Sequence, residues 1–181
     1  MVEVITKNKF LVQQVFFTPE FQFEVSEIFR MLKDQENKIF DLTFYDGGAN
    51  VMDYVISKVK SGGVFVVKYN SDIAAFFILE NPRTFGELIT RADIHTAVRR
   101  KYWGKTSREI MNCFKEYLFS HYRIKKIVAS VPQCGYGVIK LLKDLGFKHE
   151  GTLKEALIFK DKNNNPKYYD ELIYSLTMEE I

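Results

Sequence analysis

Two apolar runs joined by a short polar segment constrain the fold of this chain more than any other feature. Residues 63–69 read Gly-Val-Phe-Val-Val-Lys-Tyr, residues 73–79 read Ile-Ala-Ala-Phe-Phe-Ile-Leu, and Asn-Ser-Asp lies between them. Short runs rich in β-branched and aromatic residues are typical of buried strands, and a short Asn/Ser/Asp segment is typical of a turn. The pattern therefore predicts a buried β-hairpin with its turn at residues 70–72.

Helical patterns lie on both sides of this hairpin. Residues 18–20 read Thr-Pro-Glu, which is a helix-start signal, and apolar residues then recur at helical spacing. A second helix is expected to open at Asn50 and to end at residues 61–63, Ser-Gly-Gly. Two more helices are expected, one after Gly104 and one over residues 136–144. Together these segments predict helices that alternate with strands.

The remaining strand patterns complete a mixed α/β arrangement. Besides the hairpin, strands are expected at residues 10–17, up to about 98, and at 127–131, 153–159 and 169–177. Asn81 and Pro82 are expected to break the chain. The order is strand, two helices, three strands, helix, strand, helix and two strands. That order predicts a mixed α/β sheet.

Bulk properties indicate one soluble domain with a modest positive charge. The chain has 181 residues, of which 46% are apolar and 27% charged, and its net charge is +3. The charge is too small for a nucleic-acid-binding tail or a polybasic membrane patch, but it suits an anionic ligand bound at one place. The N-terminus does not read as a signal peptide, and two cysteines give no disulfide framework. We expect a cytoplasmic protein with no nucleic-acid or membrane partner.

Residues 92–108 carry the clearest chemical signal. They read as a strand, a basic turn with one glycine, and the start of a helix. The N-terminus of a helix offers unpaired backbone N–H groups and a partial positive charge, which together hold phosphate. The turn supplies Arg99, Arg100, Lys101, Gly104, Lys105, Thr106 and Ser107. The alternative interpretation of the same segment is a capped helix preceded by solvated basic residues.

This segment and a second one resemble motifs of the GNAT family of N-acetyltransferases. The coenzyme A motif of that family is Gln or Arg, two residues, Gly, one residue, then Gly or Ala; residues 101–106, Lys-Tyr-Trp-Gly-Lys-Thr, occupy it. Residues 145–151, Leu-Gly-Phe-Lys-His-Glu-Gly, are similar to Leu-Gly-Phe-x-x-Glu-Gly of the branch that acetylates ribosomal proteins. The resemblance implies one GNAT-like domain over residues 1–181, with a central twisted sheet of about six to seven strands and about four helices.

The resemblance also implies an activity. Members of the family move an acetyl group from acetyl-CoA to a primary amine by direct attack in a ternary complex, without a metal. The acceptor would be a small-molecule amine or a protein amine. The resemblance places the cofactor on Ala97, Val98, Arg99, Gly104, Lys105, Thr106, Ser107 and Gly135, with the pantetheine along the first three backbones and the pyrophosphate on the amides that follow Gly104.

Asp93 is the first candidate for the catalytic base, because residues 92–94, Ala-Asp-Ile, resemble the Ala-Glu-Ile that carries the catalytic Glu in some members of the family, and His95 is the second candidate. Strand alternation places both on one face with Ala97 and Arg99, and the pKa of histidine suits proton transfer at neutral pH. Glu80 is a weaker candidate. The alternative is structural, with Asp93 and His95 paired with each other or with neighbouring polar groups.

Departures from the family pattern keep two other functions open. Lys101 and Thr106 replace the usual residues of the cofactor motif, Gly135 replaces an Asn, and Leu142 replaces a Tyr that protonates the leaving thiolate. One alternative is therefore a catalytically inactive GNAT-fold binding or assembly protein, such as one encoded by a phage. The other is a nucleic-acid-binding module that uses the basic turn. The acceptor rim is expected at residues 40–50 and 159–169.

Overall fold

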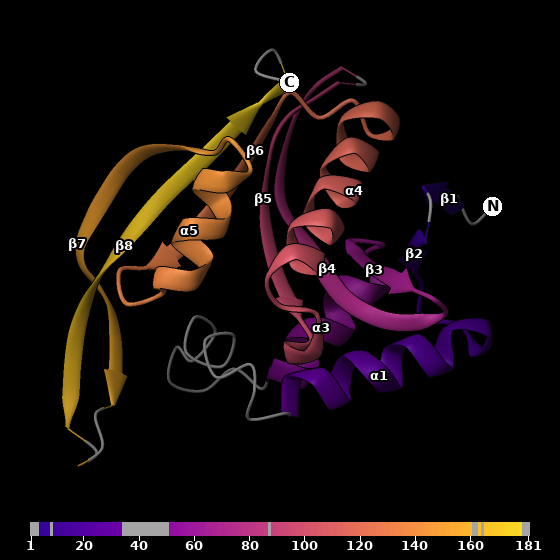
Figure 1. Ribbon diagram of the computed structural model, residues 1–181, viewed down its shortest axis with the longest axis horizontal. Coiled ribbons are helices and arrows are strands. Elements are labelled where there is room, and N and C mark those ends of the chain that lie inside the picture. Colours follow the sequence, from indigo (N-terminus) through magenta and orange to yellow (C-terminus); the bar gives the residue numbers. More distant parts are fainter. Residues whose placement is uncertain are drawn as a thin grey trace. The chain divides into compact units, whose positions relative to one another are not determined.

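The computed structural model describes residues 4–7, 9–33, 51–86, 88–160, 163 and 165–178 (Figure 1). Its elements are β1 Val4–Lys7, β2 Phe10–Val15, the 3-10 turn η1 Pro19–Phe21, α1 Gln22–Lys33, α3 Val51–Lys60, β3 Val64–Tyr69, β4 Asp72–Phe85, β5 Leu88–Val98, the 3-10 turn η3 Arg100–Tyr102, α4 Lys105–His121, β6 Lys126–Pro132, α5 Tyr136–Asp144, β7 Lys148–Lys160 and β8 Pro166–Thr177. The strands are hydrogen-bonded in the order β1-β2-β3-β4-β5-β6-β8-β7. The predicted mixed α/β class is confirmed, and the short strand β1 adds to the strands that were expected.

The chain divides into two compact units. The first comprises Met1–Glu80 and His95–Arg123, and the second comprises Asn81–Ile94 and Ile124–Ile181. Strands β4 and β5 therefore contribute residues to both units. The single domain over residues 1–181 stays a prediction.

The first unit buries the predicted hairpin on both faces. Val64, Val66 and Phe76 lie in one apolar cluster with residues of α1 and α3. Successive side chains of a strand point to opposite faces, so the residues between them face the other way. There the ring of Phe77 stacks on Phe114 of α4 with 3.8 Å between ring centroids. The uninterrupted apolar runs of the sequence follow from this burial on both faces.

The hairpin turn is shorter than expected. Asn70 and Ser71 both have positive φ, 49° and 69°, and they form the two-residue connection between β3 and β4. Paired positive φ values are typical of tight hairpin turns whose twist matches that of the strands. Asp72, expected to be part of the turn, is instead the first residue of β4. Asp72 therefore lies at the tip of the hairpin.

One other local expectation is wrong. Asn81 and Pro82 do not break the chain, because β4 continues through them to Phe85; Asn81 takes a φ of 46°, which asparagine tolerates better than most residues. Thr18 precedes the first helical turn as expected, but its side chain makes no capping hydrogen bond. The expected helix start at Asn50 lies outside the described residues.

The second unit is built on antiparallel pairs. Strand β6 pairs with β8, and β8 pairs with β7, both antiparallel, while residues 92 and 93 of β5 pair with β6 in parallel. Strands β7 and β8 begin earlier than the predicted strands. Helix α5 has the predicted bounds, Tyr136–Asp144, and Leu142 is buried.

Candidate active site

The start of α4 has an open, uncapped N-terminus. Gly104 precedes the helix with a φ of 88°, and no side chain caps the first turn. A Cβ atom built on Gly104 would meet nothing within 4 Å, so the surface beside this glycine is open. The first N–H groups of a helix have no intrahelical acceptor and point outward. The turn predicted to bind phosphate therefore has the geometry of an anion site.

The hydroxyl of Ser107 belongs to the helix itself. Its Oγ donates to the carbonyl oxygen of Gly104 at 2.8 Å, and the residue is buried. Thr106 is partly buried and Lys105 is exposed. Within the described part of the chain, the Lys105 side chain makes no hydrogen bond or ion pair. Among the basic residues predicted here, Lys105 is thus available to an anionic ligand.

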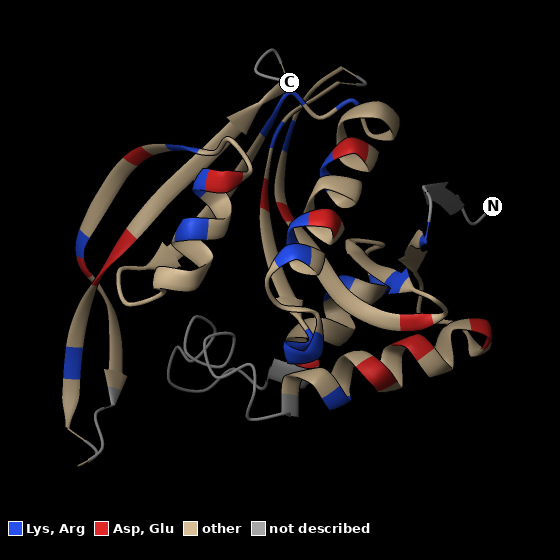
Figure 2. Cartoon of the chain, viewed as in Figure 1, with Lys and Arg blue, Asp and Glu red and all other residues tan. Residues whose placement is uncertain are grey.

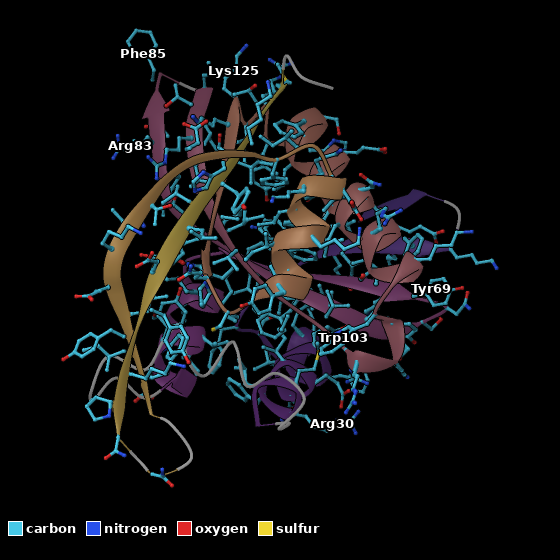
Figure 3. All side chains as sticks on the ribbon, turned by 60° about the vertical axis from the view of Figure 1, so that its left-hand side comes forward. Arg30, Tyr69, Arg83, Phe85, Trp103 and Lys125 are labelled. Atoms are coloured by element: carbon cyan, nitrogen blue, oxygen red, sulfur yellow. The ribbon has the colours of Figure 1, made fainter. Side chains whose placement is uncertain are left out.

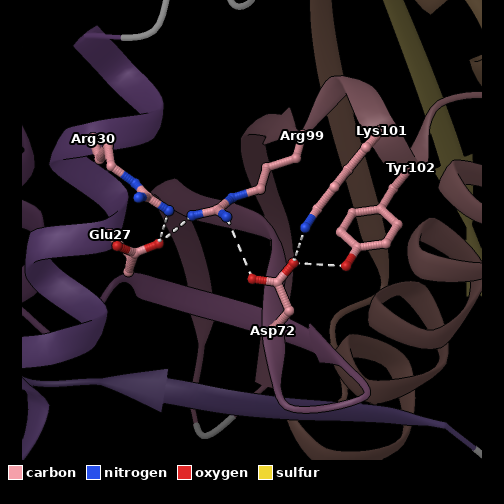
Figure 4. Close-up of polar contacts among 6 residues, drawn as sticks. All are labelled: Glu27, Arg30, Asp72, Arg99, Lys101 and Tyr102. Atoms are coloured by element: carbon pink, nitrogen blue, oxygen red, sulfur yellow. Dashed lines mark hydrogen bonds and ion pairs between the residues drawn. The ribbon is translucent and has the colours of Figure 1, made fainter.

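Two other predicted cations of the turn are engaged with carboxylates (Figure 4). Arg99 binds Glu27 of α1 and, through Nη1, Asp72 at 3.3 Å. Lys101 Nζ lies 2.6 Å from the Oδ2 atom of Asp72. Figure 2 shows acidic residues along α1 and basic residues in the turn before α4. Arg99 was predicted to line the pantetheine with its backbone; its side chain pairs with Glu27 and Asp72, and its contact with the cofactor stays a prediction.

The backbone at the end of β5 also has partners. The Arg99 N–H donates to the carbonyl oxygen of Ala74 at 2.9 Å. The Val98 carbonyl oxygen accepts a hydrogen bond from Nε1 of Trp103 at 2.9 Å. Trp103, labelled in Figure 3, is itself 55% exposed, and Ala97 and Val98 are buried. The predicted contact of pantetheine with these three backbones stays a prediction.

Three side chains converge on Glu80, at the end of the β4 segment of the first unit. His95 Nε2 lies 2.7 Å from Glu80 Oε2, and Lys58 Nζ lies 2.7 Å from Oε1. The Tyr54 hydroxyl also donates to Oε1. The side chain of Glu80 is 14% exposed and that of His95 is 23% exposed. One of the two base candidates is therefore held by a carboxylate while it still reaches solvent.

These contacts fix the charge of Glu80. Burial alone would raise its pKa, but the hydrogen bonds from His95, Lys58 and Tyr54, with the charge of His95, lower it to about 2. Burial and the hydrogen bond to Glu80 raise the pKa of Tyr54. At neutral pH Glu80 is a carboxylate and Tyr54 a neutral donor. A carboxylate in contact with an imidazole orients the ring and stabilises its protonated form.

The other base candidate, Asp93, has different partners. Its Oδ1 accepts hydrogen bonds from Arg91 at 3.2 and 3.0 Å, and its Oδ2 accepts one from Asn81 at 3.1 Å. Asp93 and His95 each pair with neighbouring polar groups, Asp93 with Arg91 and Asn81 and His95 with Glu80. Asp93, Arg91 and Asn81 all lie in the second unit, whereas His95 lies in the first.

Gly135 and Leu142 sit at the two positions where the second unit departs from the family pattern. A Cβ atom on Gly135 would lie 3.0 Å from Val131 Cγ1 and 3.1 Å from the Pro132 carbonyl oxygen. The close approach explains why glycine occupies this position. Leu142 is 3% exposed, so its aliphatic side chain serves the core of this unit.

Three residues that contact the candidate site residues were not singled out from the sequence: Tyr54, Lys58 and Asp72. Tyr54 and Lys58 are four residues apart on α3 and therefore share a face of that helix. Their common partner, Glu80, lies on β4 and is distant in sequence. Asp72 was placed in a turn without a role. Residues 40–50 of the predicted acceptor rim lie outside the described residues; in the rest of that rim, the rings of Phe159 and Tyr169 are in contact at 5.1 Å.

Neither a metal site nor a membrane-spanning helix is found in the described ranges. No three His, Cys, Asp or Glu side chains among those residues come together as metal ligands. None of the helices that the structure describes is both long enough and apolar enough to span a bilayer.

The comparison with protein families shows which family this chain belongs to. The family model described as Acetyltransferase (GNAT) domain matches residues 24–173. The chain belongs to the GNAT acetyltransferase family. The match includes β5, the turn before α4 and α5, so it contains every candidate site position named above. The predicted enzyme class, an N-acetyltransferase, is thereby confirmed at the level of the family.

Solved GNAT structures share the fold at low sequence identity. Spermidine N-acetyltransferase from Vibrio cholerae, in complex with CoA and spermine, matches with a TM-score of 0.74 at 15% identity, over 96% of this chain and 98% of that chain. Ribosomal-protein-S5-alanine acetyltransferase from Vibrio fischeri matches with a TM-score of 0.69 at 16% identity, over 97% and 96%. A GNAT acetyltransferase from Bacillus anthracis matches with a TM-score of 0.69 at 15% identity, over 98% and 100%. No curated protein sequence matches the chain.

Proposed function

We propose that this chain transfers an acetyl group from acetyl-CoA to a primary amine by direct attack in a ternary complex. Acetyl-CoA supplies the acetyl group as a thioester, whose C–S bond breaks as the new C–N bond forms. The protein binds the donor, orients the amine and accepts its proton. The observation that carries this proposal is the contact between Glu80 and His95, because His95 lies on β5, the strand that leads to the uncapped N-terminus of α4.

The start of α4 suits the phosphates of the donor. The amides of Lys105, Thr106 and Ser107 belong to the first helical turn, where N–H groups lack intrahelical acceptors. The open space beside Gly104 lets a bulky anion approach these amides. The side chain of Lys105 adds a positive charge. Backbone amides and one lysine are a sufficient donor set for a pyrophosphate.

His95 is the proposed proton acceptor. When Nε2–H donates to Glu80 Oε2, the lone pair of the ring is on Nδ1, which then takes the proton of the attacking amine. Glu80 stays ionised and stabilises the imidazolium that results. Asp93, whose carboxylate already accepts hydrogen bonds from Arg91 and Asn81, is the second choice.

The acceptor is proposed as a small-molecule amine or the amino terminus of a protein. The Vibrio cholerae structure is a spermidine acetyltransferase and the Vibrio fischeri structure a ribosomal-protein acetyltransferase. The segment 145–151 resembles the ribosomal-protein branch, which favours a protein amino terminus as the first acceptor to test.

Release of free thiol from acetyl-CoA tests this proposal. The assay uses spermidine, spermine and an alanine-terminated peptide as acceptors, with product masses measured in parallel. General bases contribute about 10²–10⁴-fold, so His95→Gln should lower kcat by at least about 100-fold while acetyl-CoA still binds. Asp93→Ala is the comparison variant. A large loss in Asp93→Ala with normal turnover in His95→Gln would assign the base to Asp93.

A second candidate function is a GNAT-fold protein without catalysis. Leu142, buried and aliphatic, cannot protonate a thiolate, and this favours the alternative. Such a protein would release no thiol with any acceptor. Absence of a thermal shift with acetyl-CoA would show in addition that the protein does not bind this donor.

A further inference from the structure

One carboxylate holds the turn between β5 and α4 at three points. Oδ2 of Asp72 accepts from Lys101 Nζ and from the Tyr102 hydroxyl, each at 2.6 Å, and Oδ1 accepts from Arg99 Nη1 at 3.3 Å (Figure 4). The three donors lie within residues 99–102, and Trp103 separates them from Gly104. Asp72 belongs to the tip of a hairpin 27 residues earlier in the chain than Arg99. The turn is therefore tied to a separate element and not only to its own neighbours.

A second carboxylate holds the other side of Arg99. Nη2 of Arg99 binds Glu27 Oε2 on α1, and the same oxygen accepts from Arg30 at 2.8 Å. The side chain of Arg99 is 14% exposed and that of Glu27 is 15% exposed. Charge-assisted hydrogen bonds of this kind are roughly twice as strong as neutral ones. The guanidinium of Arg99 is thus held between two carboxylates, one on α1 and one at the start of β4.

The hairpin tip that carries Asp72 is itself held by packing. The ring of Tyr69 lies 5.6 Å from that of Tyr102 and 5.1 Å from that of Phe10, between ring centroids. The Asn70 N–H donates to the carbonyl oxygen of Lys9 at 3.3 Å. Tyr102 is therefore held by two contacts, its ring against Tyr69 and its hydroxyl on Asp72.

We propose that Asp72 is a positioning residue for donor binding: it sets the turn at residues 99–104, and so aims the α4 amides, with Arg99 and Lys101 as anchors of that turn. This inference rests on the proposed function. Burial alone would raise the pKa of Asp72, but hydrogen bonds from Lys101 and Tyr102 and the charges of Arg99 and Lys101 hold it below its usual value. Asp72 is therefore ionised throughout the pH range of an activity assay.

The test compares two donors in the Asp72→Asn variant. Acetyl-CoA carries the phosphates, and S-acetyl-pantetheine lacks them, so only the first depends on the aim of the α4 amides. Loss of a charge-assisted hydrogen bond should raise the KM for acetyl-CoA about tenfold and leave kcat within about twofold. The KM for S-acetyl-pantetheine should stay at the wild-type value. A merely structural defect would affect both donors alike, and that result would overturn the inference.

Glu24→Gln is the matched control. Glu24 of α1 is also a poorly exposed acid in the first unit, and its Oε1 accepts from Lys68 of β3 at 2.6 Å, a residue outside the turn. This variant should leave both donors within about twofold of wild type. If Asp72→Asn fails to fold, Tyr102→Phe removes a single donor of Asp72 and should raise the KM for acetyl-CoA about threefold. Kinetics of Tyr102→Phe equal to those of the control would equally overturn the inference.

A double variant tests whether Lys101 anchors the turn through Asp72 or contacts the donor itself. If Lys101 acts only through Asp72, then Asp72→Asn combined with Lys101→Met has the KM of the worse single variant. Additive effects would show that Lys101 contacts the donor itself, which contradicts the anchor role. Wild-type protein that shows no saturation with acetyl-CoA would overturn the proposed function as well. Wild-type saturation with an Asp72→Asn variant equal to the control would overturn the positioning role alone.

Discussion

The substitution Glu80→Gln should remove a pH-dependent share of the stability of the first unit. Contacts from His95, Lys58 and Tyr54 lower the pKa of Glu80 from 4.5 to about 2. At about 1.4 kcal/mol for each pH unit, this difference is worth about 3 kcal/mol of unfolding free energy at pH 7. The side chain is only 14% exposed, so solvent screens the interaction little. Glutamine keeps the size of the side chain and loses the charge.

The sign of the pH dependence follows from the lowered pKa. A carboxylate whose pKa is lower in the folded than in the unfolded state stabilises the fold above about pH 4.5, and this stabilisation is lost as the pH falls towards 2. The stability difference between wild type and Glu80→Gln should therefore shrink by about 2 kcal/mol between pH 7 and pH 3. Urea unfolding followed by circular dichroism at a series of pH values measures it.

Glu109→Gln serves as the control for this series, because Glu109 is an exposed acid on α4. Its effect on the unfolding free energy should stay within about 0.5 kcal/mol at every pH. The reasoning is refuted if Glu80→Gln is as stable as wild type at pH 7, or if the difference between them does not change with pH.

Three other substitutions test the packing around the site. Phe114→Ala removes a ring that stacks on Phe77 and is 1% exposed, so it should lower the unfolding free energy by about 3–5 kcal/mol in urea titrations. Gly104→Ala places a Cβ on a residue with a φ of 88° and should cost about 1 kcal/mol, seen as a lower Tm. Leu142→Tyr introduces a family-like tyrosine at a position 3% exposed, and overpacking should cost about 1–3 kcal/mol in the same titrations. An unchanged Tm in Gly104→Ala or an unchanged midpoint in either other variant would contradict its reason.

Local patterns predicted most of the fold. The apolar runs on both sides of Asn70 became β3 and β4, and the spacing of Leu141, Leu142 and Leu145 gave α5 its observed bounds. These features depend on side chains that are neighbours in sequence, so periodicity reports them. The expectation that Asn81 and Pro82 would end the strand was wrong for a local reason as well. A proline is compatible with a strand where its missing N–H is not needed by a neighbour, and the sequence does not reveal which positions those are.

The candidate site was predictable only in part, because its contacts join distant segments. The basic turn was correctly located before a helix. Its acids, however, are Glu27 and Asp72, which lie 72 and 27 residues from Arg99. Likewise, His95 was a candidate on the strength of strand alternation, while its partner Glu80 lies 15 residues away on another strand. The sequence identified individual candidate residues, but which of them are in contact depends on how the strands and helices pack.

Hydrogen exchange of the α4 N-terminus tests the central claim most directly. Amides of residues 104–108, which begin a helix without a side-chain cap, should exchange more slowly when acetyl-CoA is added at saturating concentration. Mass spectrometry of peptides that cover this segment measures the change, with and without the donor. Slowed exchange at residues 104–108 is the predicted result. Unchanged exchange there, with protein that nevertheless binds acetyl-CoA, would contradict the account.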